Sequence, residues 1–464
     1  MQRAGQAAAA VALELLVGNT VLVLAGPGNN GGDALEAAAN LAHTGVEVSI
    51  VHLQGGAVSA ETAHALERAQ ASDARFIDAL PHGQHWALTI DGLFGIGLAR
   101  PLAGAARELA LAVNALGCPV LALDVPSGLD ADTGAVVGPS GVAVRASSTI
   151  TFIADKAGLH TLDGRDLAGE VLVAPLGIDP GLLPAAACML NDISMFGGQL
   201  QARRHNTHKG SFGDVAIVGG AGGMAGAPVL AARGALYCGA GRVFVASIDP
   251  GPGFDSVQPE IMFRDAALFA HPDATLVLGP GMGDSPIAAR LLGKALDGAS
   301  PLVIDADALN LVAASADLQA RLSARTAPAI LTPHPLEASR LLGVTTGVVQ
   351  GDRLAAAREL AARFGKIVVL KGSGSIIAEP GGVAVINTTG NPGLATGGTG
   401  DVLAGICGAL LAQGWPAREA ALGAVWMHGA GADRLVEQGV GPIGMTAGEL
   451  PAAVRAVLNG LASA

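Results

Sequence analysis

The sequence predicts an α/β protein made of two three-layer α/β/α domains. Short runs of Val, Ile and Leu alternate with alanine-rich segments of helical pattern, and this alternation restarts near the middle of the chain. Buried parallel strands have such continuous apolar runs, and the helices between them cover both faces of the sheet. The chain has 464 residues, which leaves room for two domains of this kind.

Six strands are expected in the first half. They span residues 20–25, 46–53, 86–91, 119–124, 148–153 and 170–175. A glycine-rich turn and a helical segment over 33–44 follow the first strand. Because helical stretches separate the strands, we expect one parallel sheet with a Rossmann-like arrangement.

The second half repeats this alternation with different motifs, so it is not a duplicate of the first. Its expected strands span residues 214–218, 242–246, 275–278, 302–304, 329–331 and 366–370. Between the halves lie turns rich in Pro and Gly and then a polar, basic stretch, RRHNTHKGSFGD. Such composition is typical of a domain boundary, which predicts domains over 1–188 and 189–464.

Composition excludes several classes of protein. Lys plus Arg is 27 and Asp plus Glu is 39, so the net charge is −12, which argues against nucleic-acid binding. The longest uncharged run, residues 380–400, is rich in Gly, Thr, Asn and Pro and predicts no membrane span. The four cysteines lie far apart without a CxxC pair, which gives no zinc framework and indicates a reducing compartment. We therefore expect a cytoplasmic protein.

The first candidate site is the loop GPGNNGGD at residues 26–33. It matches the G-x-G-x-x-G dinucleotide pattern, but the second strand ends Val51-His52-Leu53 without the acidic residue that normally binds the ribose. The loops DGLFGIG (91–97) and DVPSGLD (124–130) follow two other strands. At one edge of a parallel sheet they would bring together oxygen-bearing side chains, suited to a hard cation or to proton transfer. Those side chains are Asn30, Asp91, Asp124 and Ser127. Alternatively, each Asp only caps the next turn.

These three loops resemble the NAD(P)HX epimerase family, and the resemblance covers about residues 1–185. It implies substrate contacts at Asn29, Asn30, Gly31, Gly32, Asp33, Gly95, Ile96, Gly97, Leu98, Ala99, Arg100, Pro101 and Asp124. It also implies catalytic carboxylates at Asp91 and Asp124 and a potassium ion on Asn30, Asp91 and Ser127. Lys156 matches a lysine that follows the family's sixth strand.

Two features of the first half depart from that family. Ala34 stands where the family usually has Gly. The chain begins Met1-Gln2-Arg3-Ala4-Gly5, which resembles the middle of a family helix, so the resemblance implies a domain that is short at its N-terminus. We therefore expect this half to be less stable than the second half.

The second candidate site is the glycine-rich segment NPGLATGGTGD at residues 391–401, which leads into a helical pattern. Closely spaced glycines before a helix leave its free N–H groups facing an anion, and Asp401 would lie beside that anion. Phosphoryl transfer requires such donors together with a base for the attacking hydroxyl. There is no Walker A sequence, so a P-loop ATPase is not expected. The alternative is an Asp that only interacts with the helix dipole.

This half resembles the ADP- or ATP-dependent NAD(P)HX dehydratases of the ribokinase-like superfamily over about residues 195–460. The matching motifs are HKGSFGDVAIVGG, LGPGMG, TPHPLEASRLLG, VVLKGSGSII and NTTGNPGLATGGTGD. The resemblance implies substrate contacts at Ala227, Gly283, His334 and Asp401, with Asp401 catalytic. It implies nucleotide contacts at Lys371, Gly372, Ser373, Gly374, Ser375 and Gly400 and a magnesium role for Glu337.

Together the two resemblances imply a bifunctional enzyme that repairs hydrated nicotinamide cofactors. One half would epimerise R- and S-NADHX and NADPHX, and the other would dehydrate the S form with ADP or ATP, Mg²⁺ and K⁺. We expect a homo-oligomer. The alternatives are a thiazole or pyrimidine kinase with an accessory Rossmann-like domain, a protein in which only the dehydratase half is active, and a nucleotide-sensing binding protein.

Overall fold

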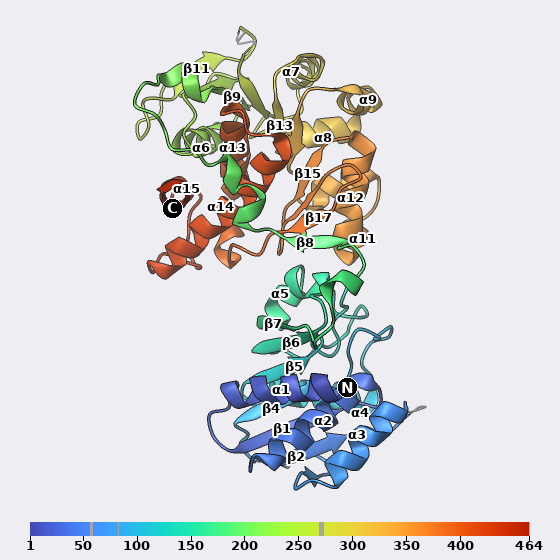
Figure 1. The fold of residues 1–464 in the computed structure, drawn as a ribbon. Helices are drawn as coiled ribbons and strands as arrows, with labels where there is room; N and C mark the ends of the chain where they lie inside the picture. Colours follow the sequence, from blue (N-terminus) through green and yellow to red (C-terminus); the bar gives the residue numbers. More distant parts are fainter. Residues whose placement is uncertain (56–58, 82, 269–272, 464) are drawn as a thin grey trace. The chain divides into compact units, whose positions relative to one another are not determined.

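The chain folds into two compact units, Met1–Ala185 and Ala186–Ala464 (Figure 1). The structure is a computed structural model that describes residues 1–55, 59–81, 83–268 and 273–463. Each unit has its own sheet with helices on both faces, so the predicted α/β class is confirmed. The second unit begins a few residues before position 189, because β8 (Cys188–Leu190) pairs with β17 (Ala384–Ile386) in its sheet.

The first unit contains a seven-stranded sheet in the order β3-β2-β1-β4-β5-β6-β7, with every pair parallel. Its strands are β1 (Thr20–Ala25), β2 (Glu47–His52), β3 (Arg75–Phe76), β4 (Leu88–Gly92), β5 (Val120–Leu123), β6 (Ser148–Phe152) and β7 (Glu170–Ala174). All six predicted strands are present. The edge strand β3 was not predicted, since two exposed residues give no apolar run.

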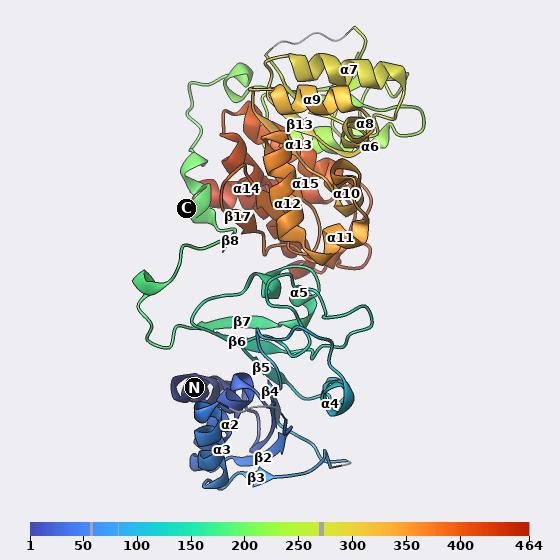
Figure 2. The same ribbon diagram turned by 90° about the vertical axis from the view of Figure 1, so that its right-hand side faces the viewer.

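Helices cover both faces of this sheet. They are α1 (Gln2–Leu15), α2 (Asn29–His43), α3 (Ala60–Gln70), α4 (Gly104–Asn114) and α5 (Gly164–Leu167), with 3₁₀ turns η1 (Ala157–His160) and η2 (Pro180–Leu182). Figure 2 shows α2 and α3 on one side of the strands and α4 on the other. The side chains of β1 alternate between two hydrophobic cores, one on each face of the sheet. Val21 and Val23 pack with α1 and α2, whereas Leu22 and Leu24 pack with α4.

The second unit contains a ten-stranded sheet in the order β11-β10-β9-β12-β13-β14-β15-β16-β17-β8. Its strands are β8, β9 (Asp214–Gly219), β10 (Arg242–Ser247), β11 (Met262–Asp265), β12 (Thr275–Leu278), β13 (Leu302–Ile304), β14 (Ala329–Leu331), β15 (Ile367–Leu370), β16 (Ile376–Ala378) and β17. The six predicted strands form its parallel centre. Strand β16 is antiparallel to both of its neighbours.

Two helical layers enclose that sheet. The helices are α6 (Gly226–Tyr237), α7 (Pro286–Asp297), α8 (Ala306–Ala314), α9 (Ala316–Ala324), α10 (Pro335–Leu342), α11 (Thr346–Gly351), α12 (Arg353–Phe364), α13 (Thr399–Ala412), α14 (Ala417–Glu437) and α15 (Leu450–Ser463). Short 3₁₀ turns are η3 (Ile193–Met195), η4 (Gly197–Gln199), η5 (Lys209–Phe212) and η6 (Pro392–Leu394). Helix α13 is buried along most of its length and packs against α6, α14 and strands β9 and β12.

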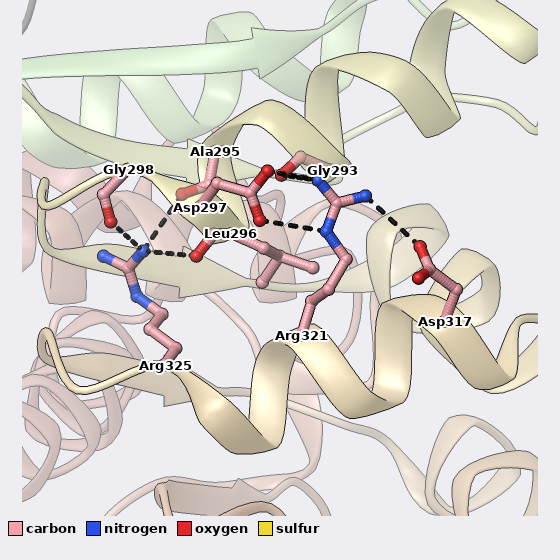
Figure 3. Close-up of polar contacts among 8 residues, drawn as sticks. All are labelled: Gly293, Ala295, Leu296, Asp297, Gly298, Asp317, Arg321 and Arg325. Carbon is pink, nitrogen blue, oxygen red and sulfur yellow. Dashed lines mark hydrogen bonds and ion pairs between the residues drawn. The ribbon is translucent and has the colours of Figure 1, made fainter.

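Two arginines tie α7 to the end of α9 (Figure 3). Arg321 forms ion pairs with Asp297 and Asp317. The buried Arg325 donates to the carbonyl oxygens of Leu296 at 3.1 Å and Gly298 at 2.7 Å. The last carbonyls of a helix have no hydrogen-bond partner within the helix. A guanidinium at this position donates hydrogen bonds to them and interacts favourably with the helix dipole. We assign this group a structural role.

Candidate active sites

In the first unit, a cleft of about 690 Å³ lies at the carboxyl ends of the strands, where the three glycine-rich loops meet. This is the edge at which parallel α/β sheets bind ligands. The cleft is lined by Met1, Ala4, Gly28, Asn29, Asn30, Asp33, Glu61, Leu93, Phe94, Gly95, Ile96, Gly97, Leu98, Asp124, Phe152, Ile153, Lys156 and Leu176. The structure therefore places eight of the predicted contacts on one cleft.

Asp91 and Ser127 form a buried pair beneath these loops. The Ser127 hydroxyl donates to Asp91 Oδ1 at 2.7 Å, and the Ser127 N–H donates to Asp91 Oδ2 at 2.8 Å. Leu93 N–H also donates to Asp91 Oδ1, at 3.2 Å. Burial raises the pKa of Asp91, although these hydrogen bonds act in the opposite direction. A buried carboxylate of this kind favours a nearby positive charge.

Asn30 lies in the first turn of α2 and is 9% exposed. Neither its Oδ1 nor its Nδ2 has a hydrogen-bond partner among the described residues. A buried amide without partners costs free energy, so an unpaired pair of polar atoms points to a missing ligand or ion. Gly95 packs so closely that a Cβ there would lie 3.3 Å from Asn30 Cγ and 2.8 Å from Asp124 Oδ2.

Asp124 directly follows β5, and each of its two carboxylate oxygens has a partner. Lys156 Nζ lies 2.8 Å from Asp124 Oδ1, and Ile96 N–H donates to Asp124 Oδ2 at 3.1 Å. Asp124 has φ +65°, a left-handed conformation that costs a residue with a side chain about 1–3 kcal/mol. Strain of this kind is maintained where the surrounding contacts aim a side chain at a site.

Asp33 is a second aspartate on the cleft, which Glu61 also lines. Burial raises the pKa of Asp33 to about 7, and the nearby Asp124 and Glu36 carboxylates act in the same direction. A carboxyl group with a pKa near neutrality can both take up and release a proton at physiological pH. The cleft therefore contains a titratable carboxyl, an ion-paired carboxylate and a lysine.

Not every predicted contact of the first site lies on the cleft. Asn29 lines it, but its Oδ1 accepts hydrogen bonds from Ser59 and Thr62, so this side chain also connects α2 to α3. Gly31 and Gly32 are buried in α2, and a Cβ at Gly31 would lie 1.9 Å from the Gly26 carbonyl oxygen. The remaining predicted contacts, Ala99, Arg100 and Pro101, are exposed and lie outside the cleft lining.

In the second unit, the predicted motifs also follow the carboxyl ends of parallel strands. Lys371 follows β15 and its Nζ lies 2.6 Å from Oδ1 of Asp305, which follows β13. Glu337 Oε2 is 4.0 Å from the same ammonium. Burial opposes the charge of Lys371, but the two carboxylates outweigh it and raise the lysine pKa. Lys371 is thus a fixed cation among acidic groups.

Asp401 lies in the first turn of α13, after the left-handed Gly398 with φ +93°. Burial raises the pKa of Asp401 to about 7; Asp305 adds to this rise, whereas Lys371 opposes it. A Cβ at Gly400 would lie 3.3 Å from Lys371 Nζ, so the lysine reaches the same helix terminus. The free N–H groups of this terminus, the lysine and a titratable carboxyl suit the binding and transfer of an anionic group.

His334 and Glu337 form a reciprocal cap at the start of α10. His334 N–H donates to Glu337 Oε2 at 2.8 Å, and His334 Nε2 lies 3.2 Å from Glu337 Oε1. Burial raises the pKa of Glu337 to about 7, and burial together with Lys371 lowers the pKa of His334. Both Glu337 oxygens are therefore engaged by His334. No group of three or more His, Cys, Asp or Glu in the described ranges could hold a metal ion.

The other predicted residues of this site lie on α6 and on two loops, at 279–285 and 371–375. Gly283 N–H donates to Asp307 Oδ2 at 2.8 Å, and Gly283 has φ +67°. Ala227 is in the first turn of α6, beside Gly281. In the loop 371–375, Gly372 and Gly374 have positive φ, and Gly372 N–H donates to Ser375 Oγ at 3.3 Å. Ser373, the third residue of this loop, is exposed.

Sequence reasoning missed two residues of this second site. Asp305 holds Lys371, and Arg353 donates to the carbonyl oxygens of Leu370 and Lys371 at 3.4 and 3.3 Å. One feature of the sequence could have identified Asp305, which is an Asp directly after a buried strand. Arg353 gave no signal, because an arginine in an alanine-rich helix resembles a solvent-facing residue, whereas this one is 1% exposed.

Comparison with known proteins assigns the chain to a family. A family model described as NAD(P)H-hydrate dehydratase matches residues 215–454, and one described as YjeF-related protein N-terminus matches residues 1–158. A bifunctional NAD(P)H-hydrate repair enzyme from Coxiella burnetii is 37% identical, covering 99% of this chain and 94% of its own length. The chain belongs to this family. The corresponding Escherichia coli enzyme is 35% identical over 94% of this chain and 85% of its own length.

Single-domain relatives of this repair-enzyme family match the second unit. The ADP-dependent (S)-NAD(P)H-hydrate dehydratase of Neisseria meningitidis is 45% identical over 58% of this chain and 93% of its own length. A Bacillus subtilis ADP/ATP-dependent NAD(P)H-hydrate dehydratase, co-crystallised with ATP/Mg²⁺, is 27% identical with a TM-score of 0.52. That match covers 59% of this chain and 98% of the other. None of the helices in the described part of the chain is long and apolar enough to cross a bilayer.

Proposed function

We propose that this chain repairs hydrated nicotinamide cofactors in two separate sites. The first unit interconverts the R and S epimers of NADHX and NADPHX, and the second unit dehydrates the S epimer with ADP or ATP. The supporting observation is that each unit has its own strand-end site, with the motif residues of the corresponding family domain gathered on it. Family membership over nearly the whole chain supports the combination.

In the first site, we assign the acid–base work to Asp124, with Asp91 below it. Asp124 lies on the cleft and is aimed by Lys156 and by the Ile96 N–H. Epimerisation at a hydrated carbon requires a group that can accept and return a proton. Asp91, fully buried and bonded to Ser127, serves to hold the loops and a cation rather than to contact substrate.

The residues of the first site fit a potassium ion. Asn30 Oδ1 has no hydrogen-bond partner among the described residues, and the Asp91 carboxylate is buried. Together with Ser127 Oγ these are oxygen donors, the type that a hard monovalent cation prefers. The ion would satisfy the Asn30 amide oxygen, offset the buried charge and hold the cofactor-binding loops in place.

Potassium should therefore be required for epimerisation. We expect most of the epimerase activity to be lost when K⁺ is replaced by tetramethylammonium, because its methyl groups prevent coordination by the buried oxygens of Asn30, Asp91 and Ser127. The measurement is the rate of R-to-S conversion at constant ionic strength, with nucleotide omitted. An unchanged rate after exhaustive removal of small monovalent cations would refute the assignment.

In the second site, the terminal phosphoryl group of ADP or ATP is transferred to the hydroxyl oxygen of the substrate. Asp401 accepts the proton that this hydroxyl loses. The new O–P bond replaces the bond to the nucleotide leaving group. Phosphate then departs with the C–O electron pair while a proton leaves the neighbouring carbon, which restores the ring double bond. Lys371 and the N–H groups at the start of α13 stabilise the transferring phosphoryl charge.

Magnesium fits this scheme as a partner of the nucleotide phosphates. Mg²⁺ usually keeps several waters and binds through one or two carboxylates plus substrate phosphates. Asp305 and Glu337 near Lys371 are carboxylates of this kind. Both oxygens of Glu337, however, already lie close to nitrogen atoms of His334. We therefore propose that Glu337 acts on the ion indirectly, through the position of His334 and Lys371.

The pH dependence of dehydration follows from Asp401. Its pKa is raised to about 7, and only the carboxylate can accept the substrate proton. We expect kcat/KM for S-NADHX to rise with pH through about 7 and then level off. In the Asp401→Asn variant, the residual rate should lose this ascending limb. A wild-type profile that is flat or falls across this range would contradict the assignment.

The kinase alternative is disfavoured because it gives no role to the loops of the first unit, which belong to a different family model. The alternative in which only the second unit is active is tested directly by R-to-S conversion without nucleotide.

We also propose a reducing cytoplasmic setting, which is supported by four cysteines that form no disulfide. We propose in addition that the chain forms a homo-oligomer, which light scattering would test.

A further inference from the structure

Helix α14 contacts the loop that leads into α13 at several points along its length. The Thr389 hydroxyl donates to the Trp426 carbonyl oxygen at 2.8 Å. A Cβ at Gly429 would lie 2.6 Å from the Thr389 carbonyl carbon, so the loop backbone lies directly against the helix. At the far end of the loop, His428 Nε2 lies 3.0 Å from the Thr399 carbonyl oxygen. Burial lowers the pKa of His428 to about 4, so the neutral ring donates this hydrogen bond.

Asp433 makes the contact that fixes the entrance of this loop. Its Oδ2 accepts the Gly390 N–H at 2.7 Å, and its Oδ1 accepts from Asn391 Nδ2 at 3.0 Å. Asn391 Oδ1 in turn accepts the Gly393 N–H at 3.0 Å. Gly390 has φ +100°, a conformation that glycine adopts without steric cost.

From Gly393 the hydrogen bonds continue to the start of α13. The Thr396 hydroxyl donates to the Gly393 carbonyl oxygen at 3.0 Å. The Thr399 hydroxyl donates to the carbonyl oxygens of Leu394 and Thr396 at 2.8 and 3.0 Å. Thr399 begins α13, two residues before Asp401. A continuous series of contacts thus runs from Asp433 to the helix terminus that carries the catalytic carboxylate.

We propose that Asp433 and Asn391 are positioning residues for the dehydratase reaction, which set the orientation of the α13 terminus and of Asp401. This inference rests on the proposed function of the second unit. Asn391 is the first residue of the glycine-rich segment 391–401, Asp433 lies outside it, and neither was predicted to contact substrate or nucleotide. Catalytic groups must be held to within a fraction of an ångström, so a contact that fixes the supporting loop affects the rate without touching substrate.

The arrangement of hydrogen-bond donors and acceptors between Asp433 and Asn391 gives a decisive test. In Asp433→Asn, one amide oxygen can still accept the Gly390 N–H, but the new NH₂ faces the NH₂ of Asn391. Turning Asn391 around would leave the Gly393 N–H without an acceptor. In Asn391→Asp, two carboxylates face each other. The double variant Asp433→Asn/Asn391→Asp restores all three hydrogen bonds with the same net charge.

The measurement is nucleotide-dependent dehydration of S-NADHX by the full chain, with kcat and the nucleotide KM determined separately. We expect each single variant to lower kcat by about tenfold, because the half-buried contact loses a hydrogen bond and Asp401 is held less accurately. The double variant should return to within about threefold of the wild type. The nucleotide KM should change less, because the loop 371–375 is separate. Glu437→Gln, an exposed change on the same helix, should behave as wild type.

Two further readouts separate positioning from loss of folding. Epimerisation in the same chain should be unchanged in every variant. Hydrogen exchange of the peptide over 388–399 should quicken in the single variants and return in the double variant. Single variants with wild-type kcat, or a double variant no better than the singles, would overturn the proposal. A wild-type chain that fails to dehydrate S-NADHX would instead refute the proposed function itself.

Discussion

Replacing Asp401 by Asn should lower nucleotide-dependent repair of S-NADHX by about 10²–10⁴-fold, the usual contribution of a general base. Asn keeps the shape of the side chain in the first turn of α13 but cannot accept the substrate proton. The ammonium group of Lys371 remains paired with Asp305, so the positive charge that attracts the phosphate is retained. The measurement is single-turnover recovery of NADH from purified S-NADHX.

The controls for Asp401→Asn come from the same chain. Nucleotide binding, followed by calorimetry, should persist, because Lys371 and the residues up to Ser375 are unchanged. Epimerisation should keep its wild-type rate, since that cleft belongs to the other compact unit. Near-normal NADH recovery would place the base elsewhere. Loss of both activities together would show that Asp401 supports the fold.

Replacing Asp124 by Asn should lower epimerisation by about 10²–10⁴-fold, for the same reason of lost proton acceptance. Asn is one of the few residues that tolerate a left-handed conformation, so the φ of +65° at this position is not a new source of strain. Its amide oxygen can still accept the Ile96 N–H, whereas Lys156 loses its charged partner. The measurement is the R-to-S conversion rate.

Dehydration of S-NADHX is the matched control for Asp124→Asn and should be unaffected. A second control is Asp132→Asn, an exposed carboxylate-to-amide change in the loop after the same strand. It should epimerise at the wild-type rate. If Asp124→Asn retains near-normal epimerisation, the proton is moved by another group on the cleft, and Asp33 is then the next residue to replace.

The fold was largely predictable because every central strand is a continuous apolar run. Strands β16 and β17 were not predicted, since three-residue runs next to Gly-rich and Thr-rich segments resemble turns. The sheet edge of each site was also predictable, because the carboxyl ends of parallel strands face the same way.

Side-chain partners within those edges could not be predicted. Asp305 and Lys371 are far apart in sequence, and their contact depends on the order of β13, β14 and β15 in the sheet. The sequence likewise gives no sign that Asn29 contacts α3. These details depend on tertiary packing, which periodicity does not encode.

The central claim is that one chain holds two independent repair sites, and R-NADHX with ADP or ATP, Mg²⁺ and K⁺ tests it most directly. Recovery of NADH absorbance from this epimer requires both sites, and its rate is compared with the spontaneous rate. We predict rapid recovery with the wild type and the spontaneous rate with either Asp124→Asn or Asp401→Asn. An equimolar mixture of the two variants should restore rapid recovery. A mixture that stays at the spontaneous rate, although each variant keeps its other activity, would contradict the account.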